Sequence, residues 1–189
     1  MLARLLRDLA PFGPTLVGTY PLGLQVDGSD LDICCTCDDL DAFERALRAV
    51  LAELAVAPSR APSRAPSRAP SRAPSRVPSR IERLPLAPEA VVASLTWEGL
   101  EIEIFCQPLP VYEQAGFRHL VIEGRLLAIG GAALRDRVLE LKRAGVKTEP
   151  AFARVLGLGG DPYAALLALE DWPGPRLREL VHGTRGQGA

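Results

Sequence analysis

Two aspartates that alternate with apolar residues, in Asp30-Leu31-Asp32-Ile33, have the types and spacing in this sequence that most clearly suggest chemistry. On a strand, residues two apart share a face and lie roughly 6.6 Å apart along it. Asp30 and Asp32 would therefore point into the same space while Leu31 and Ile33 face a core. Two carboxylates held together repel each other unless a cation lies between them. The pattern therefore predicts a cation site.

A Gly-Thr pair lies just upstream of the aspartates, where the apolar run of Thr15–Val17 ends at Gly18 and Thr19. We expect Thr15–Val17 to be a short strand and Thr19 to cap a short helix, with a turn ending at Ser29. Backbone N–H groups at a helix start hold phosphate oxygens well. Gly18 and Thr19 would offer such groups, and Ser29 is a further candidate for contacting a bound ligand. A glycine turn beside two surface acids is the simpler alternative.

A third acid comes from the alternating run Leu100–Phe105, in which Glu101 and Glu103 share one face. This run and Ala90–Trp97, joined at Glu98-Gly99, are expected to form a hairpin. Either glutamate could join the aspartates at a metal site. Alternatively, both lie on the solvent face of an edge strand.

The Gly18-Thr19 and Asp30-Leu31-Asp32 spacing resembles the signature of the nucleotidyltransferase superfamily, the polymerase-beta-like fold. Thr19 stands where serine is usual, but the hydroxyl is kept. The resemblance implies a nucleoside triphosphate substrate and Mg²⁺ or Mn²⁺ held by Asp30, Asp32 and a third acid. It favours Glu103 over Glu101 for that third position, as a metal ligand or base.

A closer resemblance covers nearly the whole chain outside a four-residue repeat. It rests on GTYPLGLQVDGSDLDI, EIEIFCQPLPVYEQAGFRHLVIEGRLL and LKRAGVKTEPAFARVLGLGGDPY. These blocks look like an uncharacterised bacterial family of nucleotidyltransferase-like proteins that is known only as a domain of unknown function. That family brings no assigned reaction, so the resemblance implies a fold and leaves the substrate open.

Several polar residues follow in the helical second half. His119 and Glu123 are four residues apart on a predicted helix, as are Gln114 and Arg118, so each pair can share a face. His119 is a candidate base or nucleotide contact, although a His–Glu pair at this spacing is often a structural hydrogen bond. Lys142, Lys147 and Glu149 lie around a predicted helix–turn–helix join. The two lysines are candidate contacts for the triphosphate. Alternatively, they are cations that the dipole favours at a helix C-terminus.

The predicted fold is α+β, with a small mixed sheet and flanking helices followed by a C-terminal helical lobe. We expect a nucleotidyltransferase-like core over residues 1–109, a helical lobe over 110–172 and a flexible tail over 173–189. The helices expected from periodicity and from start and stop signals are 2–10, 39–54, 111–129 and 132–143, with two more starting at Thr148 and Asp161.

Residues 57–80 consist of Ala-Pro-Ser-Arg five times followed by Val-Pro-Ser-Arg. A proline at every fourth residue excludes a helix or a central strand, so this insertion is expected to be a disordered loop. It is either a tolerated repeat expansion or a basic arm for phosphates or a partner. Its six arginines mask an acidic body, because the rest of the chain has 16 basic and 23 acidic residues, a net charge of -7. That charge argues against non-specific nucleic-acid binding.

The composition, 48% hydrophobic and 24% charged, is that of a globular protein, and no apolar run reaches the roughly 20 residues of a membrane span. We expect a cytoplasmic location and reduced thiols at the four cysteines, Cys34, Cys35, Cys37 and Cys106. Adjacent Cys34 and Cys35 point to opposite faces of a strand. This disfavours a zinc site and favours small buried apolar roles for these thiols.

The sequence thus predicts a metal-dependent nucleotidyltransferase that moves a nucleoside monophosphate from a nucleoside triphosphate to a hydroxyl. The acceptor is left open between a small molecule, RNA and a protein. The alternative is a non-catalytic nucleotide-sensing or protein-binding module on the same fold. A third possibility is an antitoxin-like protein that modifies a partner.

Overall fold

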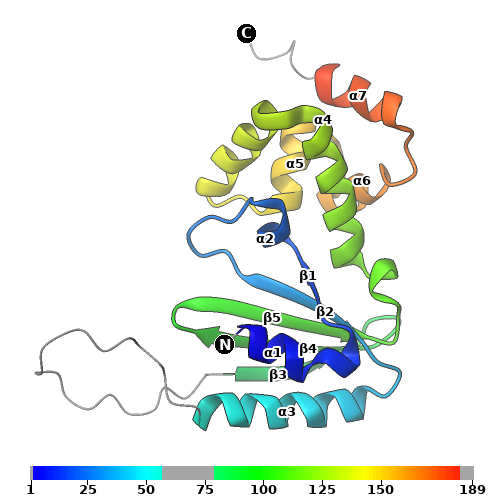
Figure 1. Ribbon diagram of the computed structural model, residues 1–189. Coiled ribbons are helices and arrows are strands. Elements are labelled where there is room, and N and C mark those ends of the chain that lie inside the picture. The colour runs from blue at the N-terminus through cyan, green and yellow to red at the C-terminus, as the bar shows by residue number, and fades with distance from the viewer. Residues whose placement is uncertain (1, 57–78, 184–189) are drawn as a thin grey trace, which may run out of the picture.

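The computed structural model describes residues 2–56 and 79–183. Its centre is a five-stranded mixed sheet in the order β1-β2-β5-β4-β3 (Figure 1). β2 and β5 are parallel, and the other neighbouring strands are antiparallel. The strands are β1 (Thr15–Val17), β2 (Leu31–Thr36), β3 (Ser79–Leu84), β4 (Ala90–Trp97) and β5 (Leu100–Gln107).

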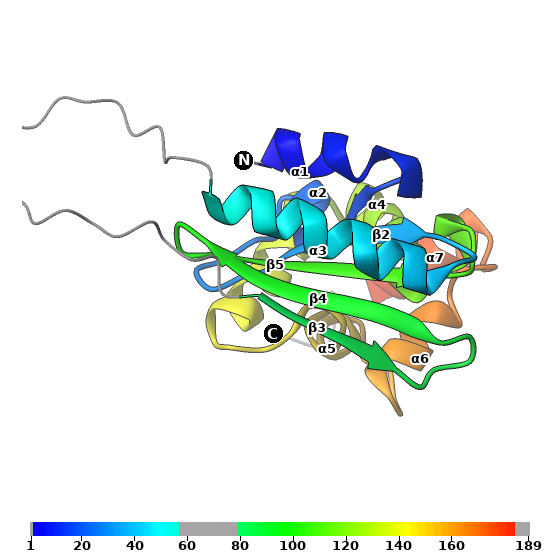
Figure 2. The same ribbon diagram turned by 90° about the horizontal axis from the view of Figure 1, so that it is seen from below.

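One face of the sheet is covered by α1 (Leu2–Asp8), which runs into the 3-10 turn η1 (Ala10–Phe12), and by α3 (Leu40–Val56). Figure 2 shows α3 lying along the strands on this side. Apolar side chains from alternate strand positions meet the helices in one core, as the period of two requires. This core contains Leu31, Ile33, Ile102 and Ile104, together with Leu5, Phe43, Leu47 and Leu51.

The other face of the sheet meets the helical lobe (Figure 1). The lobe contains η2 (Val111–Glu113), α4 (Ala115–Arg143), α5 (Thr148–Leu156), α6 (Pro162–Leu167) and α7 (Gly174–Gly183). Its own apolar core includes Ile122, Leu126, Val138, Phe152, Leu166 and Leu177. α4 is docked closely on the strands, because a Cβ on Gly116 would lie 3.3 Å from Cys34 Sγ.

A backbone break divides α4 at Gly131, whose φ of 60° and ψ of -151° are not helical. The sequence predicted separate helices ending at residue 129 and starting at residue 132, and the break lies between them. The turn after α4 contains Gly145 at a positive φ of 85°, which glycine adopts without strain. The helix after this turn, α5, is thereby brought back beside α4, and Phe152 shares the core of the lobe with Ile122 and Leu126.

The short helix α2 (Thr19–Leu22) connects β1 to the turn before β2. Its N-cap is Gly18, with a φ of 67° and a ψ of -144°, and no side chain caps it. The expectation that Thr19 caps this helix is therefore wrong, because Thr19 is already its first helical residue. Arg135 of α4 holds the other end of α2 by donating to the carbonyl oxygens of Leu22 and Gly23, at 2.6 and 3.1 Å.

The structure confirms the predicted α+β fold class, with two differences. β3 was not predicted, and its first two residues, Ser79 and Arg80, belong to the final repeat unit, so the repeat ends in an edge strand. The other repeat residues, 57–78, lie outside the described residues. The expected flexible tail is wrong for residues 174–183, because α7 forms there and buries Leu177 and Val181. None of the described helices is both long and apolar enough to cross a membrane.

Candidate active site

A pocket of about 660 Å³ lies between the open face of the sheet and the helical lobe. Pockets for small ligands usually measure roughly 300–1,000 Å³. Its walls come from the β1–α2 junction, β2, β5, α4, α5 and α6. Of the nine residues that the sequence predicted for the site, eight line this pocket: Gly18, Thr19, Asp30, Asp32, Glu103, His119, Lys142 and Lys147.

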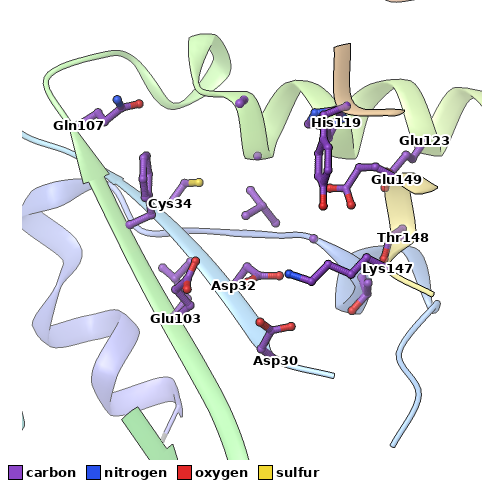
Figure 3. Close-up of a pocket in the computed structure, with 18 of the residues that line it drawn as sticks. Asp30, Asp32, Cys34, Glu103, Gln107, His119, Glu123, Lys147, Thr148 and Glu149 are labelled. Atoms are coloured by element: carbon purple, nitrogen blue, oxygen red, sulfur yellow. The ribbon is translucent and has the colours of Figure 1, made fainter. Parts of the chain in front are cut away.

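Asp32 and Glu103 are direct cross-strand partners in the parallel pairing of β2 with β5. They leave the sheet on the pocket side, while their neighbours Ile33 and Ile104 are buried in the opposite core. Asp30 immediately precedes β2 and lines the same pocket, next to Asp32 (Figure 3). The three acids thus come from β2, from the residue before it and from the adjacent strand β5, and they line one space.

The carboxylate of Asp32 occupies the space above Gly18. A Cβ built on Gly18 would lie 2.0 Å from Asp32 Oδ2, which is closer than any two such atoms can approach. Glycine also fits the backbone here, since its φ is positive. The glycine of the Gly-Thr pair therefore makes room for an acid of the candidate metal site.

Electrostatics in the pocket disfavour three charged carboxylates without a cation. Burial, and then the negative charges of Asp30, Glu103 and Glu149, raise the pKa of Asp32 to about 7. The pKa of Glu103 is also raised, first by burial and then by Asp30, against an opposing effect of Lys147. A divalent cation would remove this repulsion.

Glu101 and Ser29, by contrast, have structural partners. Glu101 is exposed and accepts a hydrogen bond of 2.6 Å from Thr96 Oγ1, on the neighbouring strand β4. It is absent from the pocket lining, so the structure favours Glu103 as the third acid. Ser29 Oγ accepts a hydrogen bond of 2.9 Å from the Val26 N–H. Ser29 closes a turn and does not line the pocket.

Thr19 follows Gly18 as the first residue of α2, and it is only 7% exposed. Its hydroxyl is buried and has no hydrogen-bond partner among the described residues. A buried hydroxyl without a partner is uncommon, because desolvation is then uncompensated. Thr19 also lines the pocket, so this unpartnered hydroxyl borders the space that a ligand would occupy.

The chain has only two lysines, and both line the pocket. Lys142 is buried near the end of α4 and donates a 2.6 Å hydrogen bond to Thr148 Oγ1. Burial lowers its pKa, whereas Glu149 and Glu123 act in the opposite direction. Lys147 is exposed, at the N-cap of α5, and its side chain points toward Asp32 (Figure 3).

The lobe side of the pocket holds a cluster of polar side chains that the sequence only partly predicted. His119 and Glu123 of α4 and Glu149 of α5 approach one another in the pocket. Tyr163 of α6 lies edge-on to His119, with 5.9 Å between the ring centroids. The sequence named His119 as a site residue and Glu123 as its helical neighbour. Nothing in the local pattern indicated that α5 and α6 would bring Glu149 and Tyr163 to them.

The other helical pair, Gln114 and Arg118, has structural roles. Gln114 is buried and donates to the carbonyl oxygens of Cys35 and Leu109, at 2.8 and 3.0 Å. Arg118 Nε donates to Glu170 Oε2 at 2.9 Å. These contacts connect α4 to the sheet and to the segment after α6. They position the lobe over the pocket.

The four cysteines are free thiols, and three of them are buried. Cys35 and Cys106 lie in the sheet core, whereas Cys34 lines the pocket beside Asp32. Burial, and then the negative charges of Asp32 and Glu103, raise the pKa of Cys34 to about 12. At neutral pH this thiol is protonated and is not a nucleophile.

Comparison with solved structures gives a distant match. A mutant of the Cid1 poly(U) polymerase bound to MgATP is 14% identical, with a TM-score of 0.49. The match covers 87% of this chain and 44% of that chain, so this chain spans less than half the length of the polymerase.

No curated protein matches the chain. A family model does match it, over residues 2–59 and 82–169. The two matched segments contain every residue that lines the pocket. The gap between them nearly coincides with the Ala-Pro-Ser-Arg repeat, which therefore lies largely outside the family match. The chain belongs to the family described as "Domain of unknown function (DUF4269)".

Proposed function

We propose that this protein is a metal-dependent nucleotidyltransferase, which moves a nucleoside monophosphate from a nucleoside triphosphate to a hydroxyl group. The observation that supports this most is the meeting of Asp30, Asp32 and Glu103 in one pocket beside Gly18. The sequence signature of the nucleotidyltransferase superfamily contains the same parts in the same order.

The pocket residues fit a divalent cation. Asp30, Asp32 and Glu103 offer only carboxylate oxygens, which Mg²⁺ and Mn²⁺ prefer. The raised pKa values of Asp32 and Glu103 indicate that their charge is poorly compensated by the protein alone. When bound, Mg²⁺ would neutralise phosphate charge and orient the triphosphate.

The charge of the pocket supports joint binding of cation and nucleotide. Five carboxylates line it, against two lysines. A triphosphate alone would be repelled by this excess of negative charge. We therefore expect nucleotide binding to depend steeply on a divalent cation, with Lys147 supplying a further positive charge to the phosphates.

The residues of the chain then have distinct roles. Gly18 and Thr19 contact phosphate oxygens through N–H and hydroxyl groups, and Lys147 fixes the triphosphate from the α5 side. Glu103 accepts the proton of the acceptor hydroxyl. A bond forms between the acceptor oxygen and the α-phosphorus, the bond from that phosphorus to the bridging oxygen breaks, and pyrophosphate leaves. Positioning and charge compensation supply most of the rate enhancement.

The experiment that tests this function is pyrophosphate release from each of the four nucleoside triphosphates with Mg²⁺. Small-molecule, RNA and protein acceptors are supplied in separate reactions. Mass spectrometry of molecules that copurify with the protein guides the choice of acceptors. We expect one combination to release pyrophosphate and to form a nucleotide adduct.

Glu103→Gln is the negative control, and Glu101→Gln is the matched variant that keeps activity. Nucleotide binding without release under any acceptor would favour the nucleotide-sensing alternative. Absence of both binding and release would contradict the proposal.

A further inference from the structure

We propose that His119, Glu123 and Glu149 form a binding site for a divalent transition metal, such as Zn²⁺, on the lobe side of the pocket. One ligand atom from each of the three residues lies within 4.8 Å of the others. The site is separate from the proposed Mg²⁺ ligands, Asp30, Asp32 and Glu103, and does not depend on the proposed function.

The elements of the lobe hold the three side chains together. His119 and Glu123 are one turn apart on α4, so they share a face. Glu149 comes from the first turn of α5, where the helix dipole favours a carboxylate. Figure 3 shows the three side chains converging at one end of the pocket. A tetrahedral ion with bonds of about 2.1 Å needs ligand atoms roughly 3.4 Å apart, a spacing that small rotations of the carboxylates would supply.

The second, independent observation is that two atoms of this cluster are buried without a hydrogen-bond partner. Glu123 is 2% exposed and His119 is 7% exposed. Neither Glu123 Oε1 nor His119 Nδ1 has a hydrogen-bond partner among the described residues. Buried polar atoms in proteins are nearly always paired. A metal ion beside them would give the buried carboxylate a partner and fix the orientation of the imidazole.

The positively charged side chain of Lys142 does not supply the missing partners of the His119, Glu123 and Glu149 cluster. Lys142 lies close enough for its charge to oppose the effect of burial on the pKa of Glu123. However, its Nζ donates to Thr148 Oγ1. An ammonium group can only donate hydrogen bonds, so Lys142 cannot act as a partner for a ring nitrogen of His119 that carries a proton. Glu123 Oε1 and His119 Nδ1 therefore remain without a hydrogen-bond partner among the described residues.

The donor set indicates the class of metal. One imidazole and two carboxylates suit Zn²⁺, Co²⁺ and Mn²⁺, whereas Mg²⁺ prefers oxygen ligands alone. Three protein ligands leave a fourth position free, as in catalytic zinc sites. Because all three residues line the pocket, a molecule bound there could take that position.

The test is a Zn²⁺ titration of the ¹⁵N-histidine-labelled full chain, with Mg²⁺ in excess to occupy the other acids. The chain has only two histidines, so exposed His182 on α7 is an internal control. We expect one equivalent of Zn²⁺ to shift the ring nitrogens of His119 and leave those of His182 unchanged. Unchanged His119 signals at one equivalent would overturn the proposal.

Variants assign the ligands. We expect Glu123→Gln and Glu149→Gln each to weaken Zn²⁺ binding by at least about 100-fold. Glu140→Gln, which changes an exposed glutamate on the same helix, should leave it unchanged. Asp30→Asn with Asp32→Asn should weaken it by less than about tenfold, which separates this site from the proposed Mg²⁺ site. Equal affinity in Glu149→Gln and Glu140→Gln would overturn the assignment, even if Glu123→Gln failed to fold.

The cysteines need a separate readout, because thiolates also bind zinc. Co²⁺ substitution distinguishes the two cases, since cobalt–thiolate bonds absorb in the near ultraviolet and nitrogen–oxygen sites do not. We expect a Co²⁺ spectrum without the thiolate band, and loss of the remaining visible bands in Glu149→Gln. A thiolate band at one equivalent would assign the metal to cysteine and overturn the proposal.

Discussion

Asp32 Oδ2 lies where a side chain on Gly18 would have to be, only 2.0 Å from the position of its Cβ. This contact connects the two halves of the sequence signature, which are separated by a short helix and a turn. The glycine is required because a candidate metal ligand fills the space above it. The same contact makes position 18 a sensitive test of the site.

We predict that Gly18→Ala abolishes Mg²⁺-dependent nucleotide binding, because the new methyl group displaces the Asp32 carboxylate. Stability should also fall, by about 1–3 kcal/mol from the strained backbone and the clash. Gly131→Ala is the matched control. Gly131 has nearly the same backbone angles, but a Cβ added to it would meet no atom within 4 Å among the described residues.

Calorimetric titration with Mg²⁺ and nucleotide, together with thermal unfolding, measures both effects. The control should lose stability but keep binding. Normal binding in Gly18→Ala would contradict the role assigned to this contact.

A second prediction concerns the pH dependence of stability without metal. The pKa of Asp32 is raised in the fold to about 7, from 3.8, so the folded state binds more protons than the unfolded state between these values. This group therefore makes the protein less stable as pH rises from about 4 to 7. Asp32→Asn should remove that loss.

We expect Asp32→Asn to exceed the wild type in stability by roughly 1–2 kcal/mol at pH 8 in chelator, after allowing for partial exposure of the carboxylate. That corresponds to about 2–8 °C in Tm. Near pH 4 the two proteins should be equal. Thermal unfolding across the pH range measures the difference. If Asp32→Asn is no more stable than the wild type at pH 8, the ionised Asp32 carboxylate does not destabilise the fold and the prediction is wrong.

A third prediction compares two glutamates on the same strand. Glu103 lines the pocket opposite Asp32, whereas Glu101 is exposed and bonded to Thr96. Glu103→Gln should weaken Mn²⁺ binding at least about tenfold, since a carboxylate ligand becomes a neutral amide. Glu101→Gln should bind Mn²⁺ as the wild type does. Electron paramagnetic resonance of free Mn²⁺ measures both affinities, and equal losses in the two variants would remove Glu103 from the site.

A fourth prediction uses the two lysines. Lys147 is exposed and Lys142 is buried, so an amine reagent should modify Lys147 first, and Mg²⁺ with nucleotide should protect it. Lys147→Gln should weaken nucleotide binding roughly tenfold, as expected for one hydrogen bond to a charged group. Arg143→Gln, which removes an exposed charge nearby, is the control. Peptide mass spectrometry follows the labelling, and unprotected Lys147 would contradict a triphosphate contact.

Local patterns in the sequence predicted most of the sheet and its chemistry. Alternation on β2 and β5 separated the buried residues Ile33 and Ile104 from the pocket residues Asp32 and Glu103, because a strand has a period of two. Alternation could not choose between Glu101 and Glu103, which share a face. The choice depends on where β5 pairs with β2, which is set by long-range packing.

The parts that sequence reasoning missed lack a strong local signal. β3 is an edge strand with Arg80, Glu82 and Arg83 among its six residues, so few apolar side chains mark it. α7 is rich in glycine, proline and arginine near its start, yet Leu177 and Val181 bury it against the lobe. Glu149 reaches His119 only because the chain turns back after α4, and that tertiary arrangement leaves no pattern in the sequence.

Isothermal titration of Mg²⁺ with a non-hydrolysable nucleoside triphosphate tests the central claim most directly, namely that Asp30, Asp32 and Glu103 together hold a metal–nucleotide complex. The wild type and Glu101→Gln should bind the complex equally, and chelator should abolish binding. Asp32→Asn should bind at least about 100-fold more weakly while remaining folded. Equal binding by Asp32→Asn and the wild type, or binding unaffected by chelator, would contradict it.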